Sequence, residues 1–564
     1  MEALDWLVIG VFFLALIGII VWVVRQKQND SADYFLGGRD ATWLAIGASI
    51  FASNIGSEHL IGLAGAGASS GMAMAHWEIQ GWMILILGWV FVPFYSRSMV
   101  YTMPEFLERR YNPQSRTILS VISLVSYVLT KVAVTVYAGG LVFQQVFGIK
   151  ELWGIDFFWI AAIGLVVLTA LYTIFGGMKS VLYTSVLQTP ILLLGSLIIL
   201  VLGFKELGGW DEMMRVCGAV TVNDYGDTMT NLIRSNDDAN FPWLGALIGS
   251  AIIGFWYWCT DQFIVQRVLS GKNEKEARRG TIFGAYLKLL PVFLFLIPGM
   301  IAFALHQKYL GAGGEGFLPM LANGSANADA AFPTLVAKLL PAGVKGLVVC
   351  GILAALMSSL ASLFNSSAML FTIDFYKRFK PKTSEKKLVV IGQMATVVIV
   401  ILGILWIPIM RSVGDVLYTY LQDVQSVLAP GIAAAFLLGI CWKRTSAQGG
   451  MWGLISGMVI GLTRLGAKVY YSNAGEVADS TFKYLFYDMN WLFFCGWMFL
   501  FCIIVVIVVS LATEAPTAEK IQGLVFGTAT KEQKTSTRAS WNHWDIIHTV
   551  IILAITGAFY WYFW

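Results

Sequence analysis

The stretch Ala48–Ala66 reads ASIFASNIGSEHLIGLAGA and is apolar and long enough to enter a bilayer. Its middle carries a group of small, polar and ionisable residues, namely Ser53, Asn54, Gly56, Ser57, Glu58 and His59. Such residues at mid-membrane depth are typical of a helix that unwinds, because freed carbonyls are tolerated only where they face a cavity rather than lipid. Carbonyl oxygens suit a bare alkali cation, whereas Asn, Glu and His side chains suit a hydroxylated solute. The stretch therefore predicts the broken helix of a membrane transporter.

The composition of the whole chain agrees with a membrane location. Of its 564 residues 57% are hydrophobic and only 13% are charged, where a soluble protein carries about 25% charged residues. Apolar runs of bilayer-spanning length follow one another, and they predict an all-α polytopic protein with about fourteen transmembrane helices. The first run, residues 4–24, is too long for the core of a signal peptide and is interpreted as a retained helix.

The sequence lacks the motifs of most enzymes. The six cysteines form no zinc or redox pattern. There is no Walker loop and no dinucleotide fingerprint, so nothing indicates ATP or a nucleotide cofactor. A membrane glycosyltransferase would need a catalytic carboxylate cluster or a metal motif in a large loop, and none is present. We expect a protein that is not an enzyme and has no cofactor.

Positive charge sorts the loops into two alternating sets. Lys and Arg are concentrated in one set, for example in 97–116, 267–279 and 377–387, whereas the intervening loops, such as 206–240, are acidic or neutral. The positive-inside rule places the basic set in the cytoplasm and both termini outside the cell. We therefore expect a multi-pass protein of the plasma membrane or the bacterial inner membrane. The polar loop 206–240 is expected to carry short surface helices.

A second irregular span, Ala251–Gln266 (AIIGFWYWCTDQFIVQ), combines a glycine with aromatic and polar residues. The two irregular spans are the second and the seventh apolar runs, so each begins a group of five helices. Interrupted helices in corresponding positions of two halves indicate an inverted-repeat transporter. The expected organisation is one transporter domain over 1–564, with an extra helix and linker at 1–42, a first repeat at 43–205, an inverted second repeat at 241–440, and peripheral helices at 441–564 that include a cytoplasmic linker at 513–544.

A few polar side chains lie within the apolar spans, and Glu78, Lys288 and Gln422 are the main ones. Glu78 and Lys288 could form an ion pair that only holds helices together. Taken singly, His59 is more often a satisfied core histidine, and aromatic residues such as those of the second irregular span are more often packing residues. As a set, however, carboxylate, ammonium, amide, imidazole and aromatic groups match the hydroxyls and the apolar face of a sugar ring.

A third feature is the serine-rich segment Ala354–Ser367, AALMSSLASLFNSS. Small residues and serines of this kind often form a packing face, with hydroxyls bonded back to the preceding turn. The adjacent hydroxyls of Ser358 and Ser359 would, beside the carbonyls of a broken helix, also make an all-oxygen site. Hard cations favour such ligands, and sodium is the cation expected.

Several long segments together resemble the sodium/glucose cotransporters of the solute:sodium symporter family. The resemblance runs from about Asp5 to the end of the chain and is weak only in the tail linker. It is carried by SNIGSEHLIGLAG at 53–65, WYWCTDQFIVQR at 256–267, GAYLKLLPVFLFLIPGM at 284–300, LMSSLASLFNSSAMLFTIDFY at 356–376 and PGIAAAFLLGICWKR at 430–444. It implies a LeuT-type fold with an inverted five-helix repeat, broken first helices, and sodium-driven sugar uptake by alternating access.

The resemblance also implies roles for individual residues. The positions that contact sugar in the family are Asn54, His59, Glu78, Tyr257, Trp258, Lys288 and Gln422. Outer-gate positions are Leu63, Trp77 and Tyr418, and Tyr257 also matches the inner gate. The main sodium site would use the backbone carbonyls of Ala52, Ile55 and Ala355 with the hydroxyls of Ser358 and Ser359. A second sodium near Asn54 and His59 would match the two-sodium members.

Three positions depart from the family pattern. Ser185 stands where the family usually has aspartate, which puts the sodium stoichiometry in question. Gln425 replaces a threonine that helps to read the sugar, and Gly254 replaces a small polar residue near the pocket. The last two departures would re-shape the pocket towards mannose, fructose, galactose or an inositol.

The function expected from the sequence is sodium-coupled symport of a glucose- or galactose-type sugar. Its partners would be the sugar, Na⁺ and membrane lipid, with no nucleic acid and no obligatory protein partner. The sequence leaves open a symporter for myo-inositol or another monosaccharide, and a sugar-gated sensor of the same fold in which binding moves charge without sugar crossing. A sodium symporter for a sialic acid or an amino acid is a further alternative, but an amino acid carrier would need a partner for a carboxylate and would not need this set of hydroxyl-binding residues.

Overall fold

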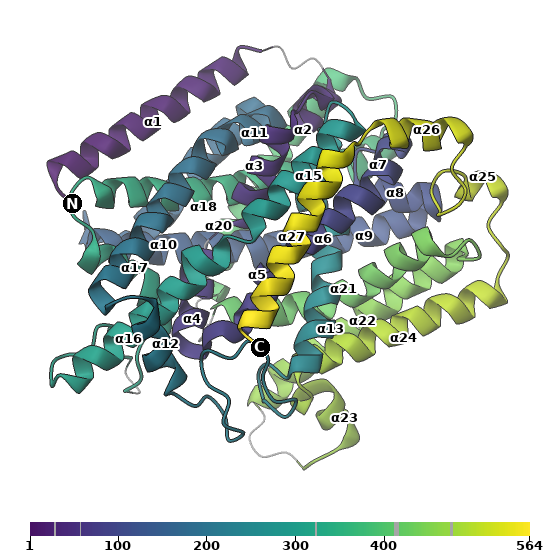
Figure 1. The fold of residues 1–564 in the computed structure, drawn as a ribbon. Helices are drawn as coiled ribbons and strands as arrows, with labels where there is room; N and C mark the ends of the chain where they lie inside the picture. The colour runs from purple at the N-terminus through teal and green to yellow at the C-terminus, as the bar shows by residue number, and fades with distance from the viewer. Residues whose placement is uncertain (27–29, 57, 322–323, 411–416, 474–477) are drawn as a thin grey trace.

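The computed structural model describes residues 1–26, 30–56, 58–321, 324–410, 417–473 and 478–564. Most of the described backbone is helical (Figure 1). The α-helices are α1 (Ala3–Val24), α2 (Ser31–Leu36), α3 (Trp43–Asn54), α4 (Ala64–Ser70), α5 (Ala75–Glu78), α6 (Gly81–Ile86), α7 (Val92–Ser98), α8 (Met103–Arg110), α9 (Pro113–Ser126), α10 (Ala133–Phe147), α11 (Phe157–Leu207), α12 (Trp210–Gly218), α13 (Trp243–Gly254), α14 (Gln262–Leu269), α15 (Glu274–Lys288), α16 (Ile297–Gly311), α17 (Ala331–Leu339), α18 (Val344–Met369), α19 (Lys377–Phe379), α20 (Glu385–Met410), α21 (Leu417–Cys441), α22 (Ala447–Asn473), α23 (Thr481–Lys483), α24 (Trp491–Ala512), α25 (Ala518–Ile521), α26 (Lys531–Ala539) and α27 (His543–Tyr562). The strands β1 (Glu151–Leu152) and β2 (Ile155–Asp156) form a small antiparallel hairpin.

Short π-helical segments continue several of these helices. They are η2 (Glu58–Leu63), η4 (Leu87–Phe91), η5 (Tyr127–Val132), η6 (Phe255–Thr260), η7 (Val292–Leu296), η9 (Leu370–Tyr376) and η10 (Tyr484–Asp488). Three-residue and four-residue 3₁₀ turns are η1 (Gly37–Arg39), η3 (Gly71–Met74) and η8 (Ala328–Ala330). π-Helical turns are rare and occur often at functional sites, because they shift the side chains of one turn relative to the next.

Both helices expected to be broken are broken. Helix α3 ends at Asn54, where Ile55 has extended backbone angles (ψ 106°), and helical structure resumes in η2. The α13–η6 segment ends in the same way, since Asp261 is extended (ψ 128°) and caps the start of α14. The breaks fall inside the two polar stretches that the sequence singled out, which confirms the interpretation that these helices unwind. The repeat boundaries themselves stay a prediction.

Helix α11 is 51 residues long, or about 77 Å at 1.5 Å per residue, which is more than twice the hydrocarbon thickness. It contains two crossings, because the chain turns at Gly177. The backbone of Gly177 has a positive φ of 52°, and a Cβ there would lie 2.4 Å from the carbonyl oxygen of Tyr34. Only glycine fits both the conformation and the close approach.

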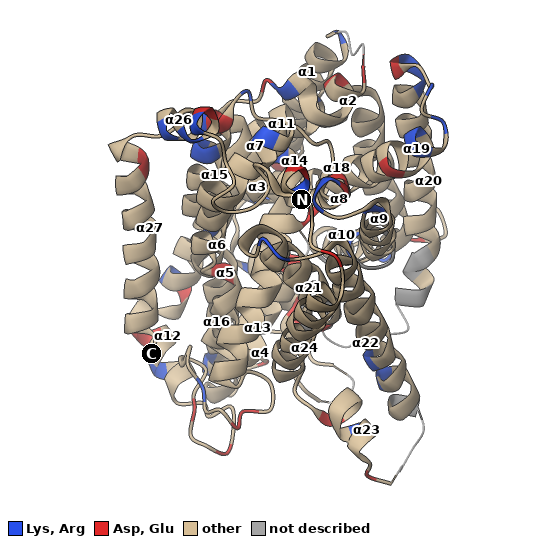
Figure 2. Ribbon diagram, turned by 90° about the vertical axis from the view of Figure 1, so that its right-hand side faces the viewer, with Lys and Arg blue, Asp and Glu red and all other residues tan. Residues whose placement is uncertain are grey.

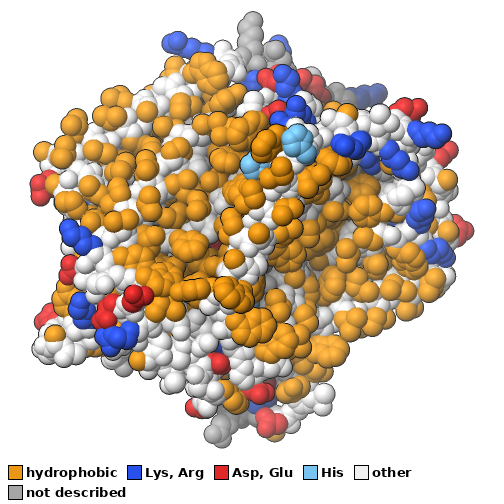
Figure 3. Space-filling view, viewed as in Figure 1, with side chains coloured by type: hydrophobic (Ala, Val, Ile, Leu, Met, Phe, Trp, Pro, Cys, Tyr) orange, Lys and Arg blue, Asp and Glu red, His pale blue; other side chains and the backbone are white. Residues whose placement is uncertain are grey.

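The surface has the pattern of a protein that spans a membrane. Ten helical segments of the described residues are long and apolar enough to cross a bilayer, and Trp43–Asn54 and Ala133–Gln144 are shorter apolar helices. Some of the ten contain more than one crossing, so the expected count of about fourteen stays a prediction. Apolar side chains cover a broad face over α1, α11, α15 and α27 (Figure 3).

The two ends of the molecule differ in charge. Lys and Arg gather around α26, α7 and α19 (Figure 2), an end that we call the α26 face. Both termini lie at the opposite end, the α12 face. Asp5 accepts hydrogen bonds from the backbone of Gly343 and Gly346 at 2.7 and 2.8 Å, and the carbonyl of Phe563 accepts one from Leu232 at 3.0 Å.

The stretch 513–544, expected to be a polar linker, contains a docked helix. Thr537 of α26 accepts a hydrogen bond from Arg97 of α7 at 2.7 Å, and Ser540 bonds Glu274 of α15 at 3.2 Å. The linker is therefore fastened to the ends of two membrane helices. The surface helices expected in 206–240 are represented by α12.

Candidate functional site

One cavity lies between the two broken helices, and residues of α5, η5, α10, α15, α18 and α21 also line it. All seven positions expected to contact sugar line it, namely Asn54, His59, Glu78, Tyr257, Trp258, Lys288 and Gln422. The volume inside the cavity is about 50 Å³, well below the roughly 300–1,000 Å³ that is usual for small-molecule sites, so the cavity is nearly closed in this structure. Residues that are far apart in the sequence therefore meet in one place, which must widen before a sugar can enter.

The charged part of the wall is an ion pair that is also hydrogen-bonded. The ammonium of Lys288 lies 2.6 Å from a carboxylate oxygen of Glu78 and donates to the side-chain oxygen of Asn54 at 3.1 Å. The same Glu78 oxygen lies 3.3 Å from Nε2 of His59. The side chains of Lys288 and Glu78 are only 3% and 2% exposed. Helices α3, α5 and α15 and the η2 turn thus each contribute one polar group to this wall.

The aromatic part of the wall comes from η6. The hydroxyl of Tyr257 accepts a hydrogen bond from the Asn54 amide at 3.1 Å, so the two broken helices are joined beside the cavity. The rings of Tyr257 and Trp258 are nearly perpendicular, with centroids 4.9 Å apart. The ammonium of Lys288 lies 5.3 Å from the centroid of the Trp258 ring, at cation–π distance.

Helix α21 contributes two amides. Gln422 and Gln425 are one turn apart, and both line the cavity. The side-chain oxygen of Gln422 is buried and has no hydrogen-bond partner among the described residues. A buried acceptor without a partner is costly, so this atom is suited to receive a hydrogen bond from a solute hydroxyl. Two of the departures from the family pattern, Gln425 and Gly254, face this cavity.

Of the expected outer-gate residues, Trp77 lines the cavity and Leu63 lies in η2 outside its lining. Leu63 is fully buried in η2, and Trp77 is 4% exposed. The Trp77 ring stacks on Trp491 of α24 at 5.5 Å and packs edge-on against Phe241 at 6.1 Å. The side chain of Tyr418 lies outside the described part of the structure.

The expected sodium residues lie where α3 ends beside α18. Ala52 and Ile55 are at the C-terminal end of α3, where the last carbonyls of a helix lack amide partners within it. Ser53 and Ser362 are hydrogen-bonded at 2.6 Å, so α3 and α18 are in contact next to the Ser358–Ser359 turn.

The position of the missing aspartate lies in the same region. The hydroxyl of Ser185 on α11 lies 3.2 Å from that of Ser358 and 3.4 Å from that of Ser49. It also donates to the Val181 carbonyl at 2.6 Å. A carboxylate at this position would face the expected sodium site, so its replacement by a hydroxyl removes one negative charge from the neighbourhood of Ser358.

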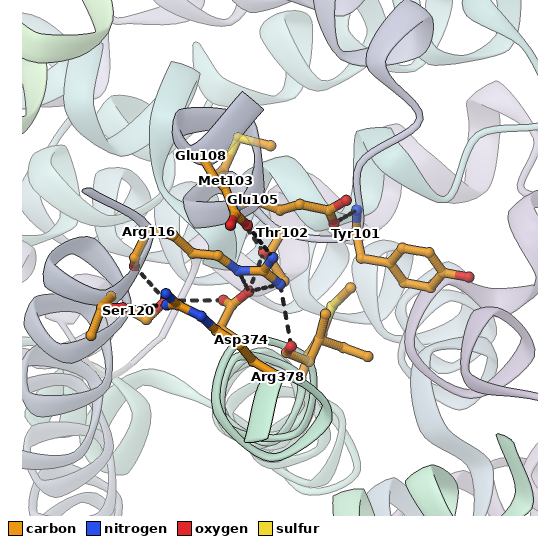
Figure 4. A network of polar contacts seen from close by, with 12 residues as sticks. Tyr101, Thr102, Met103, Glu105, Glu108, Arg116, Ser120, Asp374 and Arg378 are labelled. Atoms are coloured by element: carbon orange, nitrogen blue, oxygen red, sulfur yellow. Dashed lines mark hydrogen bonds and ion pairs between the residues drawn. The ribbon is translucent and has the colours of Figure 1, made fainter. Parts of the chain in front are cut away.

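A polar network fastens the α26-face end of α18 to its neighbours (Figure 4). The buried carboxylate of Asp374, in η9, accepts hydrogen bonds from Arg116 and Thr102 at 2.7 and 2.8 Å and from Ser120 at 3.1 Å. Arg116 also pairs with Glu108 at 2.5 Å. The helix that carries Ser358 and Ser359 is therefore held against α8 and α9.

The sequence reasoning missed several cavity residues, among them Lys131 and Gln80. Lys131 forms an ion pair with Asp261 at 2.7 Å, Tyr127 donates a hydrogen bond to the same carboxylate, and the ammonium lies 4.7 Å from the Tyr257 ring. A lysine within an apolar run is a signal that could have found it, since intramembrane charges are rare.

Comparisons with known proteins agree with this geometry. The model of the sodium:solute symporter family matches residues 34–457. The sodium/myo-inositol cotransporter 2 of Homo sapiens is 36% identical over 542 residues, which are 94% of this chain and 79% of that protein. The sodium/glucose cotransporter 1 of Ovis aries is 38% identical over 532 residues, 91% of this chain and 79% of that protein.

Among solved structures, a substrate-bound, outward-open Na⁺-coupled sialic acid symporter superposes with a TM-score of 0.72 at 22% identity. The match covers 92% of this chain and 99% of that one. Together with the two broken helices, it shows the LeuT-type fold that the sequence resemblance implied.

Proposed function

The chain belongs to the sodium:solute symporter family, and from that premise we propose that it is a sodium-coupled symporter of a monosaccharide of the glucose or galactose type. The observation that carries the proposal is the convergence of Asn54, Glu78, Lys288 and Gln422 on one cavity with an aromatic wall. These groups offer donors and acceptors to ring hydroxyls, and the aromatic wall offers a surface to the apolar face of a sugar. Transport of this kind involves no covalent chemistry, no cofactor and no obligatory protein partner.

The cavity is less suited to an anionic solute. Both lysines that line it already have carboxylate partners, Glu78 for Lys288 and Asp261 for Lys131. A carboxylate in the cavity would compete with these buried pairs, and breaking a buried pair is costly. A neutral polyol leaves both pairs in place.

A second candidate solute is myo-inositol, which is also a neutral ring with several hydroxyls. It is favoured by the similarity to the sodium/myo-inositol cotransporter 2 of Homo sapiens and by Gln425, whose amide lines the cavity where sugar transporters of the family have a threonine. Glucose and myo-inositol are therefore the two solutes to compare first.

Sodium would bind between the end of α3 and α18, with the carbonyls of Ala52, Ile55 and Ala355 and the hydroxyls of Ser358 and Ser359 as ligands. Binding there would join the broken helix to α18, whose far end is held by Asp374, and would favour the state open to the outside. After the solute enters, Leu63, Trp77 and Tyr418 would close over it. The inner route would then open past Tyr257, which is now bonded to Asn54.

The basic α26 face would be cytoplasmic by the positive-inside rule, which places both termini outside. This orientation puts the acidic and neutral loops 206–240 and 309–333 at the extracellular mouth.

The test is uptake of radiolabelled glucose and myo-inositol into proteoliposomes, with an inward sodium gradient and with choline replacing sodium. We expect sodium-dependent uptake of at least one of the two, and competition by galactose, mannose and fructose ranks the alternatives. Gln422→Ala and Ser359→Ala should each abolish most of this uptake. Sodium-dependent current or binding without flux of any of these solutes would contradict the proposal and would identify a sensor.

A further inference from the structure

Gln80 is a cavity residue whose amide nitrogen and amide oxygen both bond to the protein itself. It stands between α5 and α6, is 2% exposed and lines the cavity. Its amide nitrogen donates to the carbonyl of Ser250 on α13 at 2.8 Å. Its amide oxygen accepts the indole N–H of Trp258 at 3.3 Å. A single side chain therefore connects α13 and η6 across the turn that contains Gly254.

Gly254 provides the space that this amide occupies. A Cβ at position 254 would lie 2.5 Å from the Gln80 amide oxygen and 2.9 Å from its amide carbon. The backbone of Gly254 is ordinary right-handed helix (φ −63°, ψ −39°), a conformation that any residue adopts. Glycine is unfavourable in a helix interior compared with alanine. Room for the Gln80 amide, rather than backbone conformation, thus explains glycine at this position.

The contact decides what Trp258 offers to the cavity. Because the indole N–H is already bonded to Gln80, the ring presents its aromatic surface and keeps its donor away from solute hydroxyls. Tyr257, perpendicular to it at 4.9 Å, and Lys288, 5.3 Å from its centroid, restrict the ring from other directions.

We infer that Gln80, seated in the space left by Gly254, is a specificity-determining positioning residue, which fixes the Trp258 ring as the surface on which the ring of a neutral polyol lies. The inference rests on the proposed function, since it requires a polyol in this cavity. The two residues concerned are Gln80, which bonds to Trp258, and Gly254, which leaves space for Gln80. Neither needs to touch the solute.

A double variant at positions 80 and 254 should regain the polyol affinity that each single variant loses. Gly254→Ser alone forces the Gln80 amide out of its two hydrogen bonds, and Gln80→Ala alone removes the acceptor of the indole N–H. In the Gly254→Ser/Gln80→Ala double variant, the serine hydroxyl occupies the vacated space one turn from Trp258 and accepts its N–H. Gly254→Ala/Gln80→Ala is the matched control, because it fills the same space without an acceptor. Gln80→Met keeps the length of the side chain and removes its hydrogen bonds.

The experiment measures glucose and myo-inositol affinity and sodium affinity for the purified wild type and these variants. We expect both single variants and Gln80→Met to lose about tenfold in polyol affinity, equal to about 1.4 kcal/mol, and to change the glucose-to-inositol preference. The Gly254→Ser/Gln80→Ala variant should recover both quantities, whereas the alanine control should not. Sodium affinity measured without solute should be unchanged throughout, which shows that the variants are folded.

Unchanged polyol affinity and an unchanged glucose-to-inositol preference in the single variants and in Gln80→Met would overturn the inference. A Gly254→Ser/Gln80→Ala variant whose fold-loss of polyol affinity is the product of the two single fold-losses would overturn it as well. If the wild type binds sodium but no polyol, the proposed function fails first and the inference fails with it. If the wild type binds a polyol and only the rescue is absent, the inference alone fails.

Discussion

The ion pair between Lys288 and Glu78 provides a sharp test, because a structural and a functional role predict different behaviour for the double variant. The two groups are 2.6 Å apart and almost fully buried, with 3% and 2% of the side chains exposed. Lys288→Met leaves Glu78 as an uncompensated buried charge, and Glu78→Gln leaves Lys288 in the same state. Either change should lower the free energy of unfolding by about 3–5 kcal/mol. The double variant removes both charges, so it should regain most of this stability.

In the double variant, sugar transport should stay impaired although the stability recovers. If both groups bond solute hydroxyls, the double variant loses charge-assisted hydrogen bonds of about 1.5–3 kcal/mol each, and sugar affinity should fall at least about tenfold. The assay combines thermal unfolding of the detergent-solubilised protein with sodium-driven glucose and myo-inositol uptake in proteoliposomes.

The matched control for this test is Arg279→Met on the same helix, which breaks a partly exposed pair with Asp545. It should cost less than about 1 kcal/mol and leave transport intact. A double variant that recovers both stability and wild-type sugar affinity would show that the Lys288–Glu78 pair only holds helices together, and it would refute the reasoning.

Three further predictions concern the helices around the expected sodium site. Ser358→Ala and Ser359→Ala should each weaken the apparent sodium affinity about tenfold or more, because each removes a hydroxyl ligand of the cation. Ser367→Ala, further along the same helix, is the control. Equal effects at all three positions would contradict the assignment of Ser358 and Ser359 to the sodium site. Ser185→Asp places a carboxylate beside the hydroxyl of Ser358, so the thermal stability of the variant should rise more steeply with sodium chloride than that of the wild type. Choline chloride is the comparison. A thermal stability that does not depend on the sodium concentration would contradict a cation site there. Asp374→Asn removes the negative charge that pairs with Arg116 and one of the two acceptor oxygens that Arg116, Thr102 and Ser120 use. It should destabilise the protein by about 3–5 kcal/mol without changing sugar affinity in the folded fraction. A selective loss of sugar affinity at unchanged stability would contradict its role as an anchor.

The helix breaks were accessible from sequence for a physical reason. A polar cluster such as Ser53–His59 inside an apolar run has no stable place in lipid, so an unwound helix that faces a cavity is the available solution. The same reasoning found the second break near Asp261. Which residues surround the cavity came mainly from the family resemblance, since the positions lie on helices distant in sequence.

Contacts between residues that are distant in the sequence could not be predicted from the sequence. Lys131 and Asp261 are 130 residues apart, and neither segment carries a local sign of its partner. Gln80 follows the obvious Glu78, yet its importance depends on the space above Gly254, which only the packing of α6 against η6 reveals. The apolar runs 155–175 and 181–204, which Lys179 separates in the sequence, form the single helix α11 with a turn at Gly177.

The most direct test of the central claim is the solute accumulation ratio at equilibrium in proteoliposomes held at a potential of −100 mV inside, with equal sodium on both sides. Moving one charge through 100 mV supplies about 2.3 kcal/mol, so coupling to one sodium ion should accumulate the sugar roughly 50-fold. The ratio should collapse to unity when choline replaces sodium or when the potential is dissipated. A solute that crosses the membrane but equilibrates at a ratio of one, whatever the potential and the sodium gradient, would contradict sodium-coupled symport.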